Sequence, residues 1–390
     1  MTSRFLPGSA PDGSDTTTGA PPGQSRLRAL PSASAESQPL HGGRSRLDRR
    51  RFLLGAGAVI GASALGASAL SGCSNIASAG TRAGQLTIVG FAVLSEADLA
   101  LAADWGTTPT GTGVKVQTSF GASGEQSRNV ANGLPADFVH LSLASDVTRL
   151  VDKGLVAKDW NKGQHNGIVT KSVVVLVVRP GNPLGITGWD DLARPDVKVV
   201  TPNPSSSGSA RWNILAAWAH VGADGKHDDQ AEDFLGKVLA NTVSLPGSGR
   251  DATTAFTSGN ADVLISYENE AILARHKNPG VFDYIVPDDT LAIENPGAIL
   301  TNAQSAAAPS WLDFAHSERG QGVLAGYGFR PLAGPVPAQV QGANDPSNPY
   351  PAPGRLLGID KDFGGWSKVS KKFFADGGLV TKLLSKVASS

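Results

Sequence analysis

Residues 201–213, TPNPSSSGSARWN, join a predicted strand to a predicted helix through a turn made of small residues. Pro202 and Pro204 end the preceding element, and the helical run begins near Ala210. One serine is enough to cap a helix N-terminus, yet this turn has serine or glycine at every position from 205 to 209. It lacks the lysine of a nucleotide-binding P-loop. The stretch therefore indicates a helix start that offers neutral hydrogen-bond donors.

Strands and helices alternate along the chain from Gln85 onward. Apolar runs predict strands, and the segments between them predict helices. The expected strands are 85–93, 114–120, 136–143, 171–183, 197–202 and 261–271, and the expected helices are 125–133, 145–153, 210–221, 228–240 and 250–258. This alternation predicts an α/β architecture with largely parallel sheets.

Two more strand-to-helix turns resemble the first. FGASGEQSRNV (120–130) contains Ser123, and LPGSGRDATTAF (245–256) contains Gly249. Ligands of α/β proteins bind beyond the carboxyl ends of strands, where helix N-termini present free N–H groups. Small residues allow close approach of the backbone, so such turns can bind an anion without a formal charge. Each turn taken singly is also explained as a capped helix.

Composition excludes several classes of function. The 390 residues hold 34 basic and 34 acidic side chains, which argues against a nucleic-acid partner. A single cysteine and seven histidines without close pairing predict no metal and no cofactor. No G-x-S-x-G elbow occurs, so a hydrolase is disfavoured and the protein is not expected to be an enzyme.

The first 84 residues resemble an export and anchoring region. Residues 1–48 are expected to be a disordered extension. Residues 49–73 begin with Arg49-Arg50-Arg51-Phe52-Leu53, a twin-arginine pattern, and end with Leu70-Ser71-Gly72-Cys73, which resembles a lipoprotein lipobox. Cys73 is the expected lipidation site, and residues 74–84 are the expected tether. This predicts export and a lipid anchor at the outer face of the cytoplasmic membrane. The alternative is a single membrane span, but the apolar run is short for the roughly 20 residues that a span needs.

From about Gln85 to the C-terminus the chain resembles the sulfate/thiosulfate-binding proteins of ABC importers. The resemblance rests on NGIVTKSVVVLVVRPGNP, GWDDLARPDVKVVTPNPSSSGSARWNILAAWA, DVLISYENEAILA and the FGGW at 363–366. It implies a type II periplasmic-binding-protein fold with a ligand cleft between two α/β lobes. Lobe I is expected at 85–170 plus 268–340, lobe II at 171–267, and 341–390 as a segment packing across the lobes.

The same resemblance implies the ligand residues, all of them neutral donors. Ala92 stands where the family commonly has Asp, Ser209 where it has Gly, and Tyr267 where enteric-type proteins have Trp. Arg211 and Arg250 are implied as charges behind the ligand residues. The implied ligand set is Ala92, Ser123, Ser207, Gly208, Ser209, Gly249 and Tyr267.

The implied function is capture of sulfate, or thiosulfate, for a membrane permease driven by a cytoplasmic ATPase, by a monomer. A binding protein for molybdate or phosphate is the alternative. Phosphate-binding proteins need a carboxylate that accepts the ligand's proton, and none is among the ligand residues. Asp251 is the residue close enough in sequence to supply one.

Overall fold

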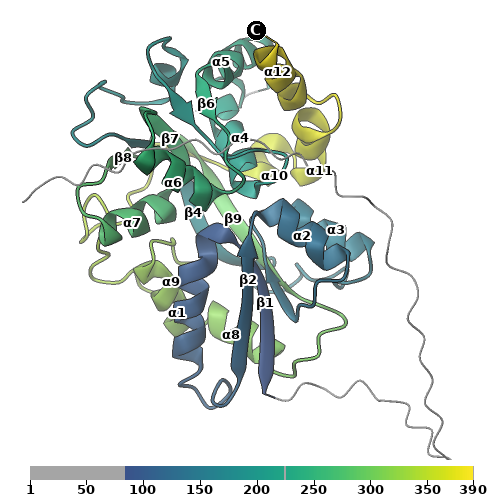
Figure 1. Ribbon diagram of the computed structural model, residues 1–390. Coiled ribbons are helices and arrows are strands. Elements are labelled where there is room, and N and C mark those ends of the chain that lie inside the picture. The colour runs from purple at the N-terminus through teal and green to yellow at the C-terminus, as the bar shows by residue number, and fades with distance from the viewer. Residues whose placement is uncertain (1–83, 224, 390) are drawn as a thin grey trace, which may run out of the picture. The chain divides into compact units, whose positions relative to one another are not determined.

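The computed structural model describes residues 84–223 and 225–389 (Figure 1). The expected disordered extension (1–48), the export signal (49–73) with Cys73, and the tether up to residue 83 lie outside the described residues. The described residues belong to one compact unit.

A mixed sheet forms the centre of the unit. Its main strands run in the order β2-β1-β3-β9-β4-β7-β5-β6, with β8 beside β4 and β10 beside β9. β1 pairs in parallel with β2 and β3, and β5 pairs in parallel with β6 and β7. The strand bounds are β1 Gln85–Phe91, β2 Lys115–Gly121, β3 Phe138–His140, β4 Ile168–Val178, β5 Val199–Val200, β6 Thr242–Ser244, β7 Val263–Tyr267, β8 Asp283–Ile285, β9 Asp289–Ile299 and β10 Arg355–Leu357.

Two long antiparallel strands join the two parallel halves of the sheet. Residues 168–173 of β4 pair with β9, and residues 174–178 pair with β7. β9 in turn pairs with β3. The run KSVVVLVV is almost wholly buried, as expected for a strand covered on both faces. The expectation of largely parallel sheets is therefore corrected at the centre, where β4 and β9 are antiparallel to each other, β9 is antiparallel to β3 and β4 is antiparallel to β7.

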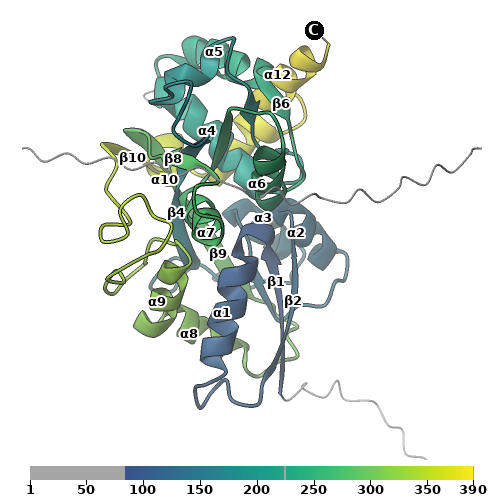
Figure 2. The same cartoon turned by 60° about the vertical axis from the view of Figure 1, so that its left-hand side comes forward.

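Helices cover both faces of the sheet (Figures 1 and 2). In the half built on β1, α1 packs with α8 and α9, and α2 packs with α3. In the other half α4 packs with α5. The helix bounds are α1 Ser95–Trp105, α2 Ser123–Ala131, α3 Ala144–Asp152, α4 Gly208–Gly222, α5 Asp228–Ala240, α6 Gly249–Ser258, α7 Glu268–Lys277, α8 Ala308–His316, α9 Glu318–Gly326, α10 Ile359–Phe363, α11 Trp366–Val369 and α12 Leu379–Ala388; the short turns are η1 Ala92–Leu94, η2 Trp189–Ala193 and η3 Ser370–Phe374.

These elements confirm the predicted α/β class and its two-lobed arrangement. Several strand predictions extend too far: β1 ends at Phe91 and not at residue 93, and β4 ends at Val178 and not at residue 183. The run 261–271 was expected to be extended throughout, but β7 ends at Tyr267 and α7 begins at Glu268. The polar residues Glu268, Asn269 and Glu270 form the first turn of α7. The positive end of the helix dipole stabilises acidic side chains at this position.

The C-terminal segment packs on several helices. The ring of Trp366 lies edge-on to Trp212 of α4 at 4.8 Å between centroids, and Phe373 lies 5.1 Å from Trp218. α11 also contacts α3, and α12 contacts α5. Across the described residues, no helix combines the length and the apolar character that crossing a bilayer requires.

Candidate functional site

Three helices begin at the turns that the sequence singled out. α2 begins at Ser123, α4 at Gly208 and α6 at Gly249. A fourth turn, η1, begins at Ala92 directly after β1. Each follows a parallel strand or the loop after it, so the positive ends of the helices lie at the carboxyl edge of the sheet.

Contacts between the turns show that they meet. The amide of Gly124 donates to the carbonyl of Ser206 at 3.1 Å, which joins the α2 turn to the α4 turn. A Cβ on Gly208 would lie 2.6 Å from Cβ and Oγ of Ser142. A Cβ on Gly249 would lie 2.9 Å from the hydroxyl of Ser209 and 3.0 Å from the side chain of Val93. A Cβ at either glycine would therefore force a neighbouring side chain to shift.

Five backbone amides at these turns have no partner among the described residues. Within residues 84–223 and 225–389, no hydrogen bond joins the backbone N–H of any of the following to another protein group: Ala92, Ser123, Gly208, Ser209 and Gly249. Ser123, Gly208, Ser209 and Gly249 are all buried. Unpaired buried N–H groups are costly, so a cluster of them indicates a place for an anionic partner.

The hydroxyl groups of Ser207 and Ser123 differ in whether they already have hydrogen-bond partners. The Ser207 hydroxyl has no hydrogen bond in the described part of the chain, although the residue is buried. The Ser123 hydroxyl donates to Oδ2 of Asp146 at 2.7 Å and accepts from the amide of Ser142 at 2.9 Å. Ser123 can therefore donate to a ligand through its backbone amide, and Ser207 can donate through its hydroxyl.

Tyr267 lies among these turns at the end of β7. Its hydroxyl is 2.8 Å from Oγ of Ser142, and its ring packs edge-on against Phe91. Burial raises the pKa of the Tyr267 hydroxyl far above its ordinary value, outweighing the polar groups of Ser142, Ser209 and Asn295. The hydroxyl is therefore neutral throughout the physiological range.

Arg250 and Arg211, the two charges expected behind the ligand residues, have their contacts elsewhere. Arg250 pairs with Glu96 of α1 at 2.7 Å and lies 2.8 Å from Glu270 of α7. Burial opposes its charge, but Glu270 and Glu96 outweigh burial and raise the pKa of Arg250. Arg211 instead stacks over the ring of Phe374 at 4.9 Å and donates to the carbonyl of Pro204.

Asp251, the alternative proton acceptor considered from the sequence, has its carboxylate hydrogen-bonded within its own turn. Asp251 is exposed, its Oδ2 accepts from the Ser248 hydroxyl at 2.8 Å, and its backbone amide donates to Oγ of Ser248 at 3.2 Å. It acts as part of the cap of α6. Asp146, which sequence reasoning missed, is a buried carboxylate beside the α2 turn; its Oδ2 accepts from the Ser123 hydroxyl and its Oδ1 accepts from Arg149.

Other contributors were missed because they come from distant segments. Ser142 follows β3, and its carbonyl accepts from Trp212 of α4 at 3.0 Å and from Asn295 of β9 at 3.1 Å. No local motif marks Ser142 or Asn295, since only the strand pairing brings them together. Among the described residues, no cluster of metal-ligating side chains is present.

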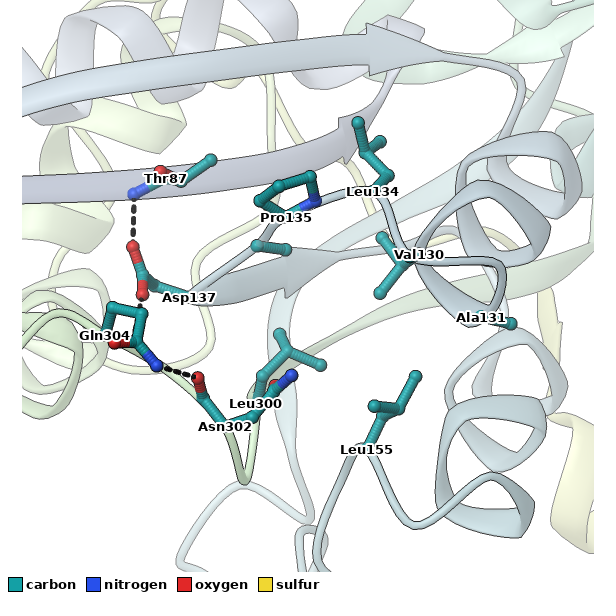
Figure 3. Close-up of a pocket in the computed structure, with 12 residues that line it drawn as sticks. Thr87, Val130, Ala131, Leu134, Pro135, Asp137, Leu155, Leu300, Asn302 and Gln304 are labelled. Carbon is teal, nitrogen blue, oxygen red and sulfur yellow. Dashed lines mark hydrogen bonds between the residues drawn. The ribbon is translucent and has the colours of Figure 1, made fainter. Parts of the chain in front are cut away.

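The hollow drawn in Figure 3 lies at the other end of the strands. Its volume is about 290 Å³, and its buried polar group is the carboxylate of Asp137. That carboxylate accepts from the amides of Thr87, Gln304 and Ser305 at 2.7–3.0 Å. Because these bonds fasten the loops before β3 and after β9, the carboxylate has a structural role.

Known proteins that resemble this chain are binding proteins for small solutes. Residues 86–330 match the family described as bacterial extracellular solute-binding protein. The sulfate-binding protein of Synechococcus elongatus is 37% identical over 87% of this chain and 98% of its own length, and the thiosulfate-binding protein of Pseudomonas aeruginosa is 34% identical over 70% and 83%. The solved sulfate-binding protein SubI from Mycobacterium tuberculosis has 41% identity and a TM-score of 0.69, covering 74% of this chain and 99% of that one.

The fold and the converging amides define a binding protein for a small anionic solute. The chain belongs to the bacterial extracellular solute-binding protein family. Membership in an extracellular family agrees with the expected export.

Proposed function

We propose that this protein is a solute-binding lipoprotein that captures sulfate, and also thiosulfate, outside the cytoplasmic membrane and delivers it to the permease of an ABC transporter. It performs no chemistry on its ligand. The observation that carries the proposal is the set of unpartnered amides at Ala92, Ser123, Gly208, Ser209 and Gly249, with the free hydroxyl of Ser207 beside them. Relatives named for sulfate and for thiosulfate support both ligands.

Neutral donors are sufficient for such a ligand. A hydrogen bond to a charged group contributes about 1.5–3 kcal/mol, and a micromolar dissociation constant corresponds to about 8 kcal/mol. Several such bonds together offset the cost of desolvating a dianion and of bringing the two halves of the protein together. Tyr267 is proposed to line the site as a hydroxyl donor where an indole N–H would serve in relatives of the enteric type.

The lobe boundaries inferred from the sequence, 85–170 plus 268–340 and 171–267, are part of the proposal. Strand pairing favours β4 and β9 as the connections between lobes, because they pair with each other, β9 pairs with β3 of one half and β4 pairs with β7 of the other. The segment 341–390 is proposed to pack across the lobes, and its contacts with α3, α4 and α5 support this.

Replacing Ser207 with alanine tests the ligand set. The change removes one hydroxyl donor and leaves the amides, so sulfate binding should weaken by about 1–3 kcal/mol. Isothermal titration calorimetry of residues 74–390 measures the change, with Ser205→Ala, an exposed serine of the same turn, as the control. If Ser207→Ala binds sulfate as tightly as the unchanged protein, the hydroxyl does not contact the ligand.

Replacing Cys73 with serine tests the proposed anchor. Cys73 is the sole cysteine of the chain and follows a lipobox-like sequence, so the variant should no longer be lipidated. Incorporation of a labelled fatty acid in cells should occur in the unchanged protein and not in Cys73→Ser. Equal labelling of the two would exclude lipidation at this residue.

A further inference from the structure

A second hollow lies between α3, α4 and the C-terminal segment, and none of the amide donors lines it. Its volume is about 590 Å³. It brings together elements from both halves of the sheet, since α3 follows β3 and α4 follows β5. Its charged and aromatic lining consists of Arg149, Asp152, Arg211, Trp366, Lys371 and Phe374.

The three cations of this hollow, Arg149, Arg211 and Lys371, outnumber two carboxylates: Asp152, which lines it, and Asp146, which pairs with Arg149. Arg149 pairs with Asp146 at 3.0 Å and donates to the Ser127 hydroxyl. Arg211 donates through Nε to a carbonyl, and within the described ranges its terminal nitrogens have no hydrogen-bond partner. Lys371 is exposed and forms no ion pair with any described residue. The hollow therefore has a net positive charge, although the net charge of the whole chain is zero.

The guanidinium of Arg211 is held in place without being neutralised. The ring of Phe374 lies beneath it at 4.9 Å, which fixes its plane. Burial lowers the pKa of Arg211, and the nearby charges of Arg149 and Arg128 lower it further, against the attraction of Asp146. Crowded cations of this kind become more stable when an anion binds between them.

We propose that this hollow is a second, weaker site for small oxyanions, which gathers sulfate beside the neutral site and raises its rate of association. This rests on the proposed function. The neutral site has no net charge with which to attract a dianion from a distance, whereas a cationic hollow does. The two are linked through Asp146, which binds Arg149 on one side and the Ser123 hydroxyl on the other.

Stopped-flow fluorescence with sulfate at low ionic strength tests the kinetic effect. Lys371 touches none of the amide donors, so Lys371→Gln should leave the dissociation rate unchanged and lower the association rate constant about threefold; Lys371→Glu should lower it about tenfold. At about 1 M salt the differences should vanish. Lys382→Gln, an exposed lysine of α12 outside the hollow, is the matched control and should change neither rate. Association that is equally fast in all four proteins would overturn the proposal.

A structural measurement tests occupancy independently. Crystals grown without sulfate and soaked in selenate should show anomalous scattering beside Arg211 and Lys371, and this signal should be lost in Lys371→Glu crystals. No selenium signal there, or one that persists in the variant, would contradict the second site. The proposed function fails separately, if calorimetry finds no binding of sulfate or thiosulfate to the unchanged protein.

Discussion

Replacing Gly208 with alanine is expected to weaken sulfate binding at least about 100-fold while the protein remains folded. The added Cβ would lie 2.6 Å from Cβ and Oγ of Ser142 and 3.0 Å from the side chain of Leu143. Ser142 follows β3 and Gly208 starts α4, so the clash forces the two halves of the site apart. Losing two charge-assisted hydrogen bonds, at about 1.5 kcal/mol or more each, accounts for a change of this size.

The matched control for this variant is Gly322→Ala in α9, where a Cβ would meet nothing within 4 Å. Alanine also favours a helix over glycine, so neither substitution should unfold the chain. Calorimetry measures the sulfate affinity of the two variants, and thermal unfolding followed by circular dichroism checks that both are folded. Tight sulfate binding by Gly208→Ala would show that the halves do not close over Gly208 and Ser142.

Replacing Arg330 with methionine is expected to lower the free energy of unfolding by about 3–5 kcal/mol. The carboxylate of Glu268 is completely buried at the start of α7, and Arg330 binds both of its oxygens, at 2.6 and 2.8 Å. Removing the guanidinium leaves a buried charge without a partner. Chemical denaturation at pH 7 measures the loss, and Arg319→Met, which breaks an exposed pair with Asp104, should cost no more than about 1 kcal/mol.

The destabilisation should depend on pH in a defined direction. Burial raises the pKa of Glu268 even in the presence of Arg330, and without the arginine it should rise further. A carboxyl whose folded pKa is raised disfavours folding as it ionises, so the deficit grows as the pH rises and shrinks as the pH falls toward 5. A deficit for Arg330→Met that is constant from pH 5 to 7 would show that Glu268 does not cause it.

The starts of α2, α4 and α6 could be predicted from the sequence because their signals are local. Glycine and serine after an apolar run mark such turns wherever they occur. The structure places these starts within two residues of the predicted helices, at Ser123, Gly208 and Gly249. Their convergence was implied by resemblance alone, because no spacing in the chain records it.

Other parts of the site could not be predicted, for tertiary reasons. Asp146 has no motif and becomes important only because α3 lies beside α2, where its carboxylate takes the Ser123 hydroxyl. Ser142 and Asn295 are 153 positions apart and meet through the pairing of β3 with β9. The end of β7 was misplaced because the burial of Glu268 depends on Arg330, which lies 62 positions away.

Selectivity between sulfate and phosphate tests the central claim, that the ligand is held by neutral donors alone. Sulfate has no proton near neutrality, whereas inorganic phosphate keeps at least one, and a phosphate proton without an acceptor costs about 1–3 kcal/mol. The proposed ligand residues include no carboxylate; the Asp146 oxygens accept from Ser123 and Arg149, and the Asp251 carboxylate accepts from Ser248.

The decisive measurement is therefore calorimetric titration of residues 74–390 with sulfate from pH 6 to 8, repeated in the presence of equimolar phosphate. The account predicts a sulfate affinity that is nearly independent of pH, because amides, serine hydroxyls and a tyrosine of strongly raised pKa do not titrate in that range. It also predicts that phosphate leaves the sulfate isotherm almost unchanged. Displacement of bound sulfate by equimolar phosphate at pH 7 would contradict the donor-only site and assign the protein to phosphate.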